Sequence, residues 1–311
     1  MNVTPPSERA LVVAKKDFLD AARSKLLIGL GIFFVIAEVI MTLIEAKILI
    51  PVMNAGEGAT AAEVTRSIAG HSVMFVGFVA VLIAYRSIAG ERASGSLKIL
   101  MSAPLSRSDI VLGKVLGRWA VLALPLTVGF SVATILGWIL VGGIDIPAFL
   151  LGLFAVVAFA LTYVAIVVAL SASIGSTMRV VALSVFLFLF FQFMWDFVPT
   201  ILYLGVEYIQ QGDSVQIGAL LTKDWPAWTF LFNAISPNAA FDTSINLVTG
   251  REVAPPLHPV VGSIFSLIGL IQAPSVTDTW YATNWLGPIS LLLWTVLSVA
   301  LGYVRFELAD L

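Results

Sequence analysis

The chain has 311 residues, of which 59% are apolar and 12% charged, and its mean hydropathy is +1.00. A soluble domain carries about 25% charged residues, so this composition indicates an integral membrane protein. The sequence contains no cysteine, only two histidines and a net charge of -2. These values exclude disulfides and thiolate chemistry, and they exclude a basic surface for nucleic acid.

The interfacial segment at the N-terminus, residues 1–25, comes first. Within it, residues 10–25 place Leu11, Ala14, Phe18 and Ala22 on one helical face, while charged side chains occupy another. We expect this helix to lie flat on the inner leaflet as an anchor, with contact to a cytoplasmic partner as a further possibility.

Six apolar stretches follow that are long enough to cross a bilayer, which takes about 20 apolar residues in a helix. They cover residues 26–44, 72–89, 119–144, 148–171, 180–206 and 286–304. We therefore predict an all-α integral membrane protein with a single transmembrane domain over residues 1–311, in which the first five spans lie within 26–206.

The basic residues determine the expected orientation. With the N-terminus in the cytoplasm, 13 of the 17 Lys and Arg residues fall on the inner side, as the positive-inside rule requires. This predicts a multi-pass protein of the plasma membrane with both termini in the cytoplasm.

The connection between the second and third spans can form a short amphipathic helix. Ser94 is a candidate N-cap, Leu97, Leu100 and Met101 supply an apolar face, and Pro104 ends the helix. An apolar face on a basic cytoplasmic loop favours a protein partner. The alternative is that these side chains dip into the inner leaflet.

The residues after this helix complete a recognisable pattern. Ser106 and Asp109 form a capping-box pattern at the start of the third span. Together with Ala89-Gly-Glu-Arg-Ala-Ser-Gly-Ser-Leu97, Ser102-Ala-Pro-Leu-Ser-Arg107 and Val111-Leu-Gly-Lys114, the segment resembles the type-2 ABC transporter permease family, and within it the NosY-like branch. The six-span layout agrees with that resemblance.

The resemblance implies a coupling helix that docks in a groove of a separate ATPase subunit. Residues on or beside that helix and its following turn are Glu91, Gly95, Leu97, Leu100, Met101, Pro104 and Arg107. Arg107 and Lys114 would bracket the return into the membrane. Glu91 is expected to pair with Arg86 or Arg92, which would make the loop rigid.

The resemblance further implies an exporter. This transporter would contain two copies of an ABC ATPase and a second permease copy, either identical or a close paralogue. No phosphate-binding loop of the Gly-x-x-x-x-Gly-Lys-Ser/Thr type is present in the sequence. We therefore expect this chain not to be an enzyme, and we expect ATP and Mg²⁺ to bind the partner ATPase. No metal or other cofactor is expected on this chain itself.

Two acids are expected within the membrane, Glu38 in the first span and Asp196 in the fifth. Buried ionisable groups are costly in a bilayer and often functional. Snorkelling, or capping of a helix broken at Pro199, explains them equally well. An ion-coupled secondary transporter that uses both acids is therefore one alternative function, and a non-transporting membrane scaffold or assembly factor is another.

The segment before the last span, residues 207–285, is too long for a simple connection. It contains apolar runs at 215–221, 226–235 and 260–273, each shorter than a span. We predict an extracytoplasmic segment with re-entrant or interfacial helices. The alternative, a seventh span at 260–273, would place the tail at 305–311 outside the cell.

Overall fold

The computed structural model describes residues 6–49, 59–211, 225–250 and 283–309. Regular structure in these ranges is helical, which confirms the all-α prediction. The first helices are α1 (Pro6–Ala22), α2 (Lys25–Ile44), the π-helix η1 (Glu45–Leu49), α4 (Ala61–Ala84), α5 (Ala89–Ser94), α6 (Ser96–Met101) and α7 (Arg107–Val141). The remaining ones are α8 (Ile146–Ser173), α9 (Thr177–Leu189), the π-helix η2 (Phe190–Met194), α10 (Phe197–Gln211), α11 (Ala227–Asn233), α12 (Pro237–Thr249) and α14 (Leu286–Glu307).

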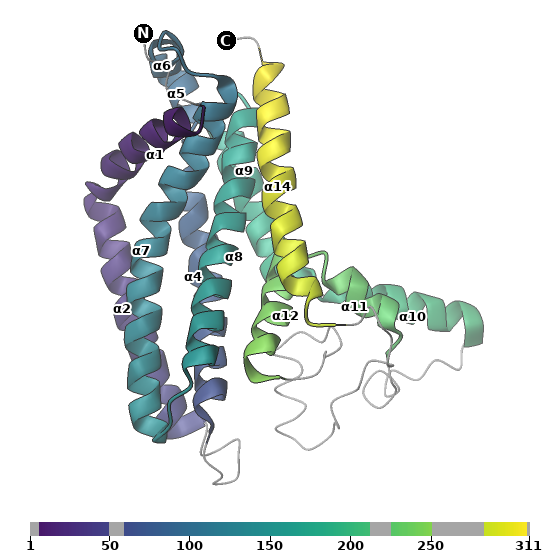
Figure 1. Cartoon of the computed structure of the whole chain (residues 1–311). Coiled ribbons are helices and arrows are strands. Elements are labelled where there is room, and N and C mark those ends of the chain that lie inside the picture. The colour runs from purple at the N-terminus through teal and green to yellow at the C-terminus, as the bar shows by residue number, and fades with distance from the viewer. Residues whose placement is uncertain (1–5, 50–58, 212–224, 251–282, 310–311) are drawn as a thin grey trace.

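Six helical segments in the described part of the chain are long and apolar enough to span a membrane, as predicted. Among them, α7 has 35 residues, or about 52 Å at 1.5 Å per residue, and so extends beyond a hydrocarbon core of about 30 Å. Figure 1 shows α1, the α5–α6 pair and the last turns of α14 at one end of the bundle, which is called the elbow end below.

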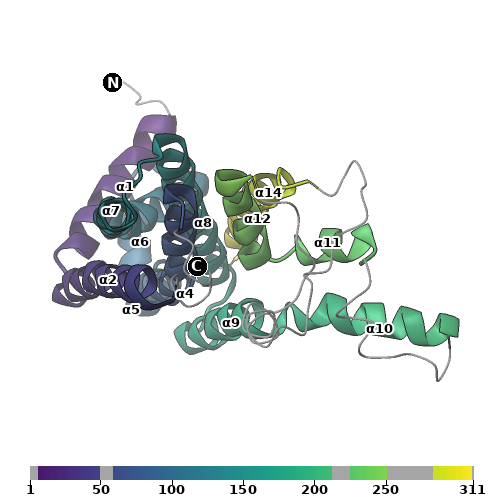
Figure 2. The same cartoon turned by 90° about the horizontal axis from the view of Figure 1, so that it is seen from below.

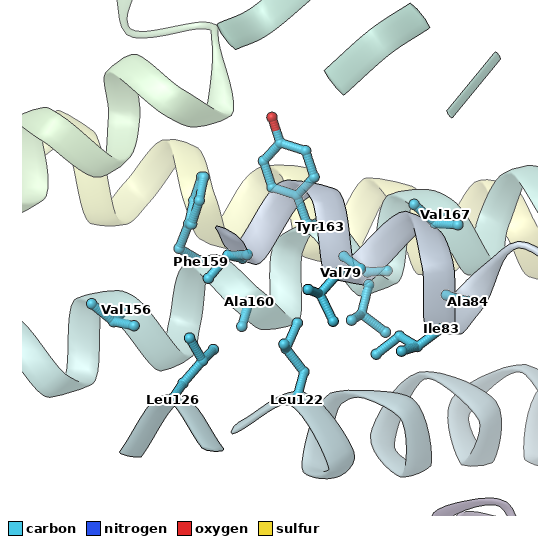
Figure 3. Packing of buried hydrophobic residues seen from close by; sticks show 14 of the residues in the cluster. Val79, Ile83, Ala84, Leu122, Leu126, Val156, Phe159, Ala160, Tyr163 and Val167 are labelled. Carbon is cyan, nitrogen blue, oxygen red and sulfur yellow. The ribbon is translucent and has the colours of Figure 1, made fainter. Parts of the chain in front are cut away.

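The helices α4 and α8 form the centre of the bundle, with α2 and α7 on one side and α12 and α14 on the other (Figure 2). Small residues allow close packing there: Ala80, Ala84 and Ala160 are fully buried, which fits the preference for small side chains between membrane helices. Larger side chains such as Leu122 and Phe159 fill the space between the helices (Figure 3).

The fifth span differs from the prediction of one helix over 180–206. It ends with η2 at Met194, and after a turn α10 runs sideways from the bundle in both views (Figures 1 and 2). Pro199 lies in the first turn of α10, where its missing N–H is tolerated. In the turn, the Trp195 ring stacks on Phe232, with centroids 5.7 Å apart, and its Nε1 donates to the Asn233 carbonyl oxygen at 3.1 Å.

Other boundaries also moved. The second and third spans begin earlier than expected, at Ala61 and Arg107. Hydropathy missed the first turns of the third span, because Lys114 and Arg118 in them carry paired charges.

The predicted outer segment holds two described helices. Of its three apolar runs, 226–235 forms α11, whereas 215–221 and 260–273 lie outside the described residues. The sequence analysis missed α12, whose Phe241 and Ile245 reach the bundle core. Asparagine, serine and threonine side chains interrupt its apolar pattern, yet Asn238 is buried, where it bonds Tyr163 and donates to Gln192 Oε1 at 2.9 Å.

Candidate functional site

The N-terminal helix packs on the start of α7 through two glycines. A Cβ on Gly117 would lie 2.8 Å from the Ala14 carbonyl oxygen, and one on Gly113 would lie 2.5 Å from Val13 Cβ. Ala14 is buried in this contact, whereas Leu11 of the predicted apolar face is 59% exposed, and attachment of that face to the inner leaflet stays a prediction. The glycines let α1 approach α7, so the helix is a packed part of the bundle.

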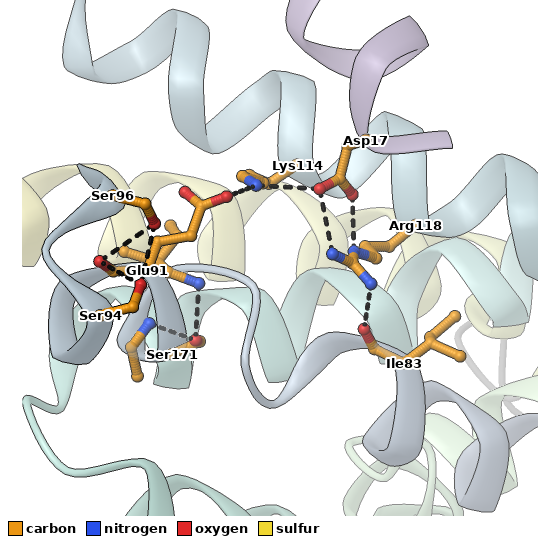
Figure 4. A network of polar contacts seen from close by, with 10 residues as sticks. Asp17, Ile83, Glu91, Ser94, Ser96, Lys114, Arg118 and Ser171 are labelled. Atoms are coloured by element: carbon orange, nitrogen blue, oxygen red, sulfur yellow. Dashed lines mark hydrogen bonds and ion pairs between the residues drawn. The ribbon is translucent and has the colours of Figure 1, made fainter. Parts of the chain in front are cut away.

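A charge network joins α1, α5 and α7 at the elbow end (Figure 4). Lys114 Nζ on α7 donates to Asp17 Oδ1 on α1 at 2.9 Å and also bonds Glu91 on α5. Arg118 Nε lies 2.6 Å from Asp17 Oδ2, and its Nη1 donates to the Ile83 carbonyl oxygen on α4 at 2.9 Å. Lys114 and Asp17 are almost fully buried, so charges of both signs tie α1, α5 and α7 together, and Arg118 links α4 through a backbone carbonyl oxygen.

Glu91 therefore has a different partner from the one predicted. It pairs with Lys114, 23 residues further along the chain, rather than with Arg86 or Arg92. Arg86 is exposed, and Arg92 Nη2 donates instead to the Ala172 carbonyl oxygen at 3.2 Å. Sequence reasoning placed Lys114 only at the entrance to the membrane, because the pairing depends on how α5 folds back on α7.

The break between α4 and α5 is held by a serine of α8. Ser171 Oγ accepts hydrogen bonds from the backbone N–H groups of Ile88 and Ala89, each at 3.0 Å, and donates to the Tyr85 carbonyl oxygen at 3.0 Å. The first N–H groups of a helix lack partners within it. Ser171 supplies these partners from another span. The sequence gives little sign of this role, because Ser171 is one hydroxyl group in an apolar helix.

The short helix predicted after residue 94 exists as α6, but its cap and its buried face differ from expectation. Gly95, at φ +75°, separates α5 from α6, and Ser94 makes no cap, since its hydroxyl donates to the Glu91 carbonyl oxygen at 3.2 Å. Leu97 is only 2% exposed and belongs to the core, whereas Ile99 is 75% exposed. The apolar face therefore packs mainly on the chain itself.

Leu100 and Met101 are half-buried and pack against the same core. Pro104 is exposed, and its carbonyl oxygen accepts a hydrogen bond from Arg9 Nη1 at 3.2 Å. The turn after α6 is thereby linked to α1. The roles that the resemblance implies for these residues remain predictions.

The entry into α7 follows the predicted capping box. Asp109 N donates to Ser106 Oγ at 3.1 Å, and Ser106 N donates to Asp109 Oδ2 at 2.9 Å. Between them, Arg107 donates to the carbonyl oxygens of Phe306, of Glu307 at 2.7 Å and of Ala309. Arg107 thus caps the C-terminal end of α14, where a cation is favoured by the helix dipole.

The intramembrane acids do not form one site. Glu38 is 3% exposed between α2 and α4, accepts a bond from Ser72 Oγ at 3.2 Å and lies 3.9 Å from His71 Nδ1. The other ring nitrogen of His71 lies 3.9 Å from Glu45 Oε2. These neighbours of His71 are not evident from the sequence, because they depend on how α2 and η1 lie against α4.

Asp196 lies elsewhere, in the turn between η2 and α10, where its carbonyl oxygen accepts a bond from Thr200 Oγ1 at 2.9 Å. In Figure 2, α4 lies between α2 and the α9–α10 region. A shared ion site of Glu38 and Asp196 therefore has no support in this arrangement. Within the described ranges, no group of three or more His, Cys, Asp or Glu side chains could hold a metal ion.

These features define a polytopic helical membrane protein in which a charge network joins α1, α5 and α7 at the elbow end. The sequence matches the model of the ABC-2 family transporter proteins over residues 11–311, and the chain belongs to this family. This confirms the resemblance to type-2 ABC transporter permeases.

Two curated relatives carry the name probable ABC transporter permease protein NosY. The protein of Stutzerimonas stutzeri is 30% identical over 135 residues, which are 43% of this chain and 47% of the relative. The protein of Pseudomonas aeruginosa is 31% identical over 142 residues, or 46% and 50%. The chain spans about half the length of the curated relatives it matches, and the resemblance to the NosY-like branch is confirmed.

Proposed function

We propose that the chain is the permease subunit of an ABC exporter and that α5 and α6 transmit movement from a separate ATPase. One observation carries this proposal: Glu91 on α5 and Asp17 on α1 share the buried ammonium group of Lys114 on α7. A force applied to α6 passes through α5 to α1 and α7, because buried ion pairs resist separation.

The complete transporter in this proposal has two ATPase subunits and a second permease copy, identical or closely related. ATP and Mg²⁺ bind the ATPase subunits. The elbow end and both termini face the cytoplasm, in keeping with the distribution of basic residues. When ATP binding closes the ATPase pair, the elbow ends of the two permease copies move together. This movement switches the helix bundles between inward-facing and outward-facing states.

The ATPase contact proposed here uses the exposed side of α6. Ile99 is the apolar side chain that α6 leaves uncovered, and Lys98, Ser102 and Pro104 around it are exposed. Leu97, Leu100 and Met101 anchor α6 on the permease instead. An uncovered apolar residue within a polar rim is the usual form of a binding hot spot.

A matched pair of substitutions tests this contact. Ile99→Asp alters the exposed face of α6, and Leu308→Asp alters an equally exposed apolar residue, 74% against 75%, at the end of α14. Each variant is purified in mild detergent from its native host, and co-purifying proteins with a phosphate-binding loop are identified by mass spectrometry. We expect the ATPase with the wild type and Leu308→Asp and its loss with Ile99→Asp. Equal recovery with Ile99→Asp would contradict the proposed contact.

The alternative functions make different predictions. An ion-coupled carrier needs no ATPase, and a scaffold moves no substrate. Transport into reconstituted vesicles is compared with an active and with a hydrolysis-deficient ATPase partner. Transport by an exporter stops with the deficient partner, and transport by an ion-coupled carrier continues. A scaffold transports nothing with either partner. The family match supports the ATP-driven transporter.

A further inference from the structure

An apolar groove runs along the outside of the bundle between α1, α2 and α7. It has a volume of about 390 Å³. Its walls come from Phe18 and Ala22 on α1, from Leu27, Ile28, Gly31, Ile32, Val35 and Ile36 on α2, and from Val121, Leu124, Pro125 and Val128 on α7. Its floor lies where α2 and α7 approach closely, since a Cβ on Gly31 would lie 3.1 Å from Pro125 Cβ.

The groove has the depth of one membrane leaflet. It follows α2 from Leu27 to Ile36, nine residue steps, or about 13 Å at 1.5 Å each. Half of a hydrocarbon core measures about 15 Å. The groove begins beside the α1–α2 junction and stops at about the middle of the candidate span Lys25–Ile48, so its length suits a single acyl chain.

The mouth of the groove is basic. Arg23 and Lys25 lie between the lining residues Ala22 and Leu27 in the chain, and both are exposed. Lys15, Lys16 and Asp20 of α1 are exposed as well, whereas Asp17 is buried with Lys114 and Arg118. The exposed charges from residue 15 to 25 therefore sum to +3, which favours an anionic headgroup.

Other occupants fit less well. The lining is apolar throughout, and an apolar groove does not hold ordered water. A helix of a second copy, as a cylinder about 10 Å wide over the same 13 Å, has a volume of about 1,000 Å³ and is too large to enter the groove whole, and the basic mouth favours a lipid headgroup over such a helix.

We propose that this groove binds one acyl chain of an anionic phospholipid whose phosphate faces Arg23 and Lys25. The bound lipid fills the space between α2 and the underside of α1, the helix that carries Asp17 of the charge network. It thereby holds α1 against α7 at the elbow end. This site is separate from the ATPase contact and does not depend on it.

Native mass spectrometry of the full chain in detergent tests the proposal. The protein is stripped of lipid and titrated with dioleoyl phosphatidylglycerol, with dioleoyl phosphatidylcholine and with oleate. We expect one tightly bound phosphatidylglycerol, about tenfold preferred over phosphatidylcholine, and weak binding of oleate. If phosphatidylcholine or oleate binds as tightly as phosphatidylglycerol, the groove does not select an anionic phospholipid, and the proposal is overturned.

Two matched pairs of variants locate the lipid. Val128→Trp fills the groove, whereas Val132→Trp places the same side chain one turn along α7, outside the lining, at a position of similar exposure, 44% against 48%. Arg23→Gln with Lys25→Gln removes the basic mouth, and Arg179→Gln with Arg305→Gln removes two other exposed cations.

We expect Val128→Trp to abolish the tight site and the first charge pair to weaken it about 25-fold, at about fivefold per cation near the surface. The two control variants retain wild-type affinity. Unchanged binding by Val128→Trp, or equal losses in a variant and its control, overturns the assignment to this groove.

Discussion

Two buried polar regions of this protein neutralise their charges in different ways. At the elbow end, Asp17 meets Lys114 at 2.9 Å and Arg118 at 2.6 Å. In the other region, Glu38 on α2 and Glu45 at the start of η1 face the imidazole of His71 at 3.9 Å on each side. In the first region, Lys and Arg side chains pair with the acids and so link the helices. In the second region, carboxyl oxygens remain without a Lys or Arg partner.

This difference determines how each region responds to the loss of a charge. A buried acid that is paired and hydrogen-bonded contributes to holding its helices, because removal of its partner leaves an uncompensated charge. A buried acid without a cation is a cost to the fold. Glu38 Oε2 and Glu45 Oε2 make no hydrogen bond in the structure. We therefore expect substitutions in the two regions to have opposite effects on stability.

The largest effect is expected from Lys114→Met, which removes the shared cation. Glu91 then loses its ammonium partner, and Asp17 retains only Arg118. Loss of one partner of a buried pair costs about 3–5 kcal/mol. Glu91 is one quarter exposed, so we expect about 2–3 kcal/mol, measured as thermal unfolding followed by tryptophan fluorescence in detergent.

Lys98→Met is the control, because Lys98 is exposed on α6. It should leave the melting temperature unchanged. Addition of Glu91→Gln to Lys114→Met should recover part of the loss, since the stranded carboxylate is then neutral. A Lys114→Met variant as stable as the wild type would show that the network does not join the helices.

The next effect tests whether the network depends on the close approach of α1 to α7. Gly117→Val places a branched side chain 2.8 Å from the Ala14 carbonyl oxygen and beside Asp17 Cβ, so the backbone of α1 must move. Overpacking of this kind costs about 1–3 kcal/mol, and we expect about 2 kcal/mol in the same unfolding measurement.

The matched glycine is Gly29 on α2, where a Cβ meets no atom within 4 Å. Gly29→Ala should stabilise the protein by about 0.5–1 kcal/mol, because glycine is unfavourable inside a helix. Equal effects of the two substitutions would mean that α1 is not held on α7 by this contact.

The sharpest comparison replaces one acid in each region by its neutral isostere. Glu91→Gln removes a charge that Lys114 requires and should destabilise by about 1–2 kcal/mol. Glu38→Gln removes a buried charge without a cation, keeps an acceptor for Ser72 Oγ and should be neutral or stabilising. Unfolding at pH 8 gives both values, and the comparison fails if Glu38→Gln destabilises as much as Glu91→Gln.

Much of the fold was predictable because the bilayer imposes one strong rule. A span must be apolar and helical, so the number of spans followed from hydropathy alone. The break after Met194 was not predictable in this way, because residues 195–206 are as apolar as a span and only Pro199 signals the change. The helix α12 was missed for the reverse reason, since polar side chains such as Asn238 and Ser244 are buried beside its apolar ones.

The candidate site was predictable in part. The capping box of Ser106 and Asp109 is local in sequence, and the structure contains it. The partner of Glu91 and the burial of Leu97 depend on the tertiary path of the chain, which a single sequence does not encode in any short motif. The surroundings of His71 depend on the tertiary path as well, because its neighbours Glu38 and Glu45 come from α2 and η1.

The smallest expected effect concerns Arg107, which holds the elbow end from the side of α14. Its guanidinium caps the carbonyl oxygens of Phe306, Glu307 and Ala309 and lies 5.5 Å from the Phe306 ring centre. Arg107→Gln should cost about 1 kcal/mol, because the group is partly exposed and water replaces some of its bonds. Arg179→Gln, an exposed arginine near the start of α9, should cost nothing measurable. Hydrogen exchange localises the difference: faster exchange confined to the last turn of α14 supports capping by Arg107, whereas unchanged exchange there means that this end is held by its apolar contacts alone.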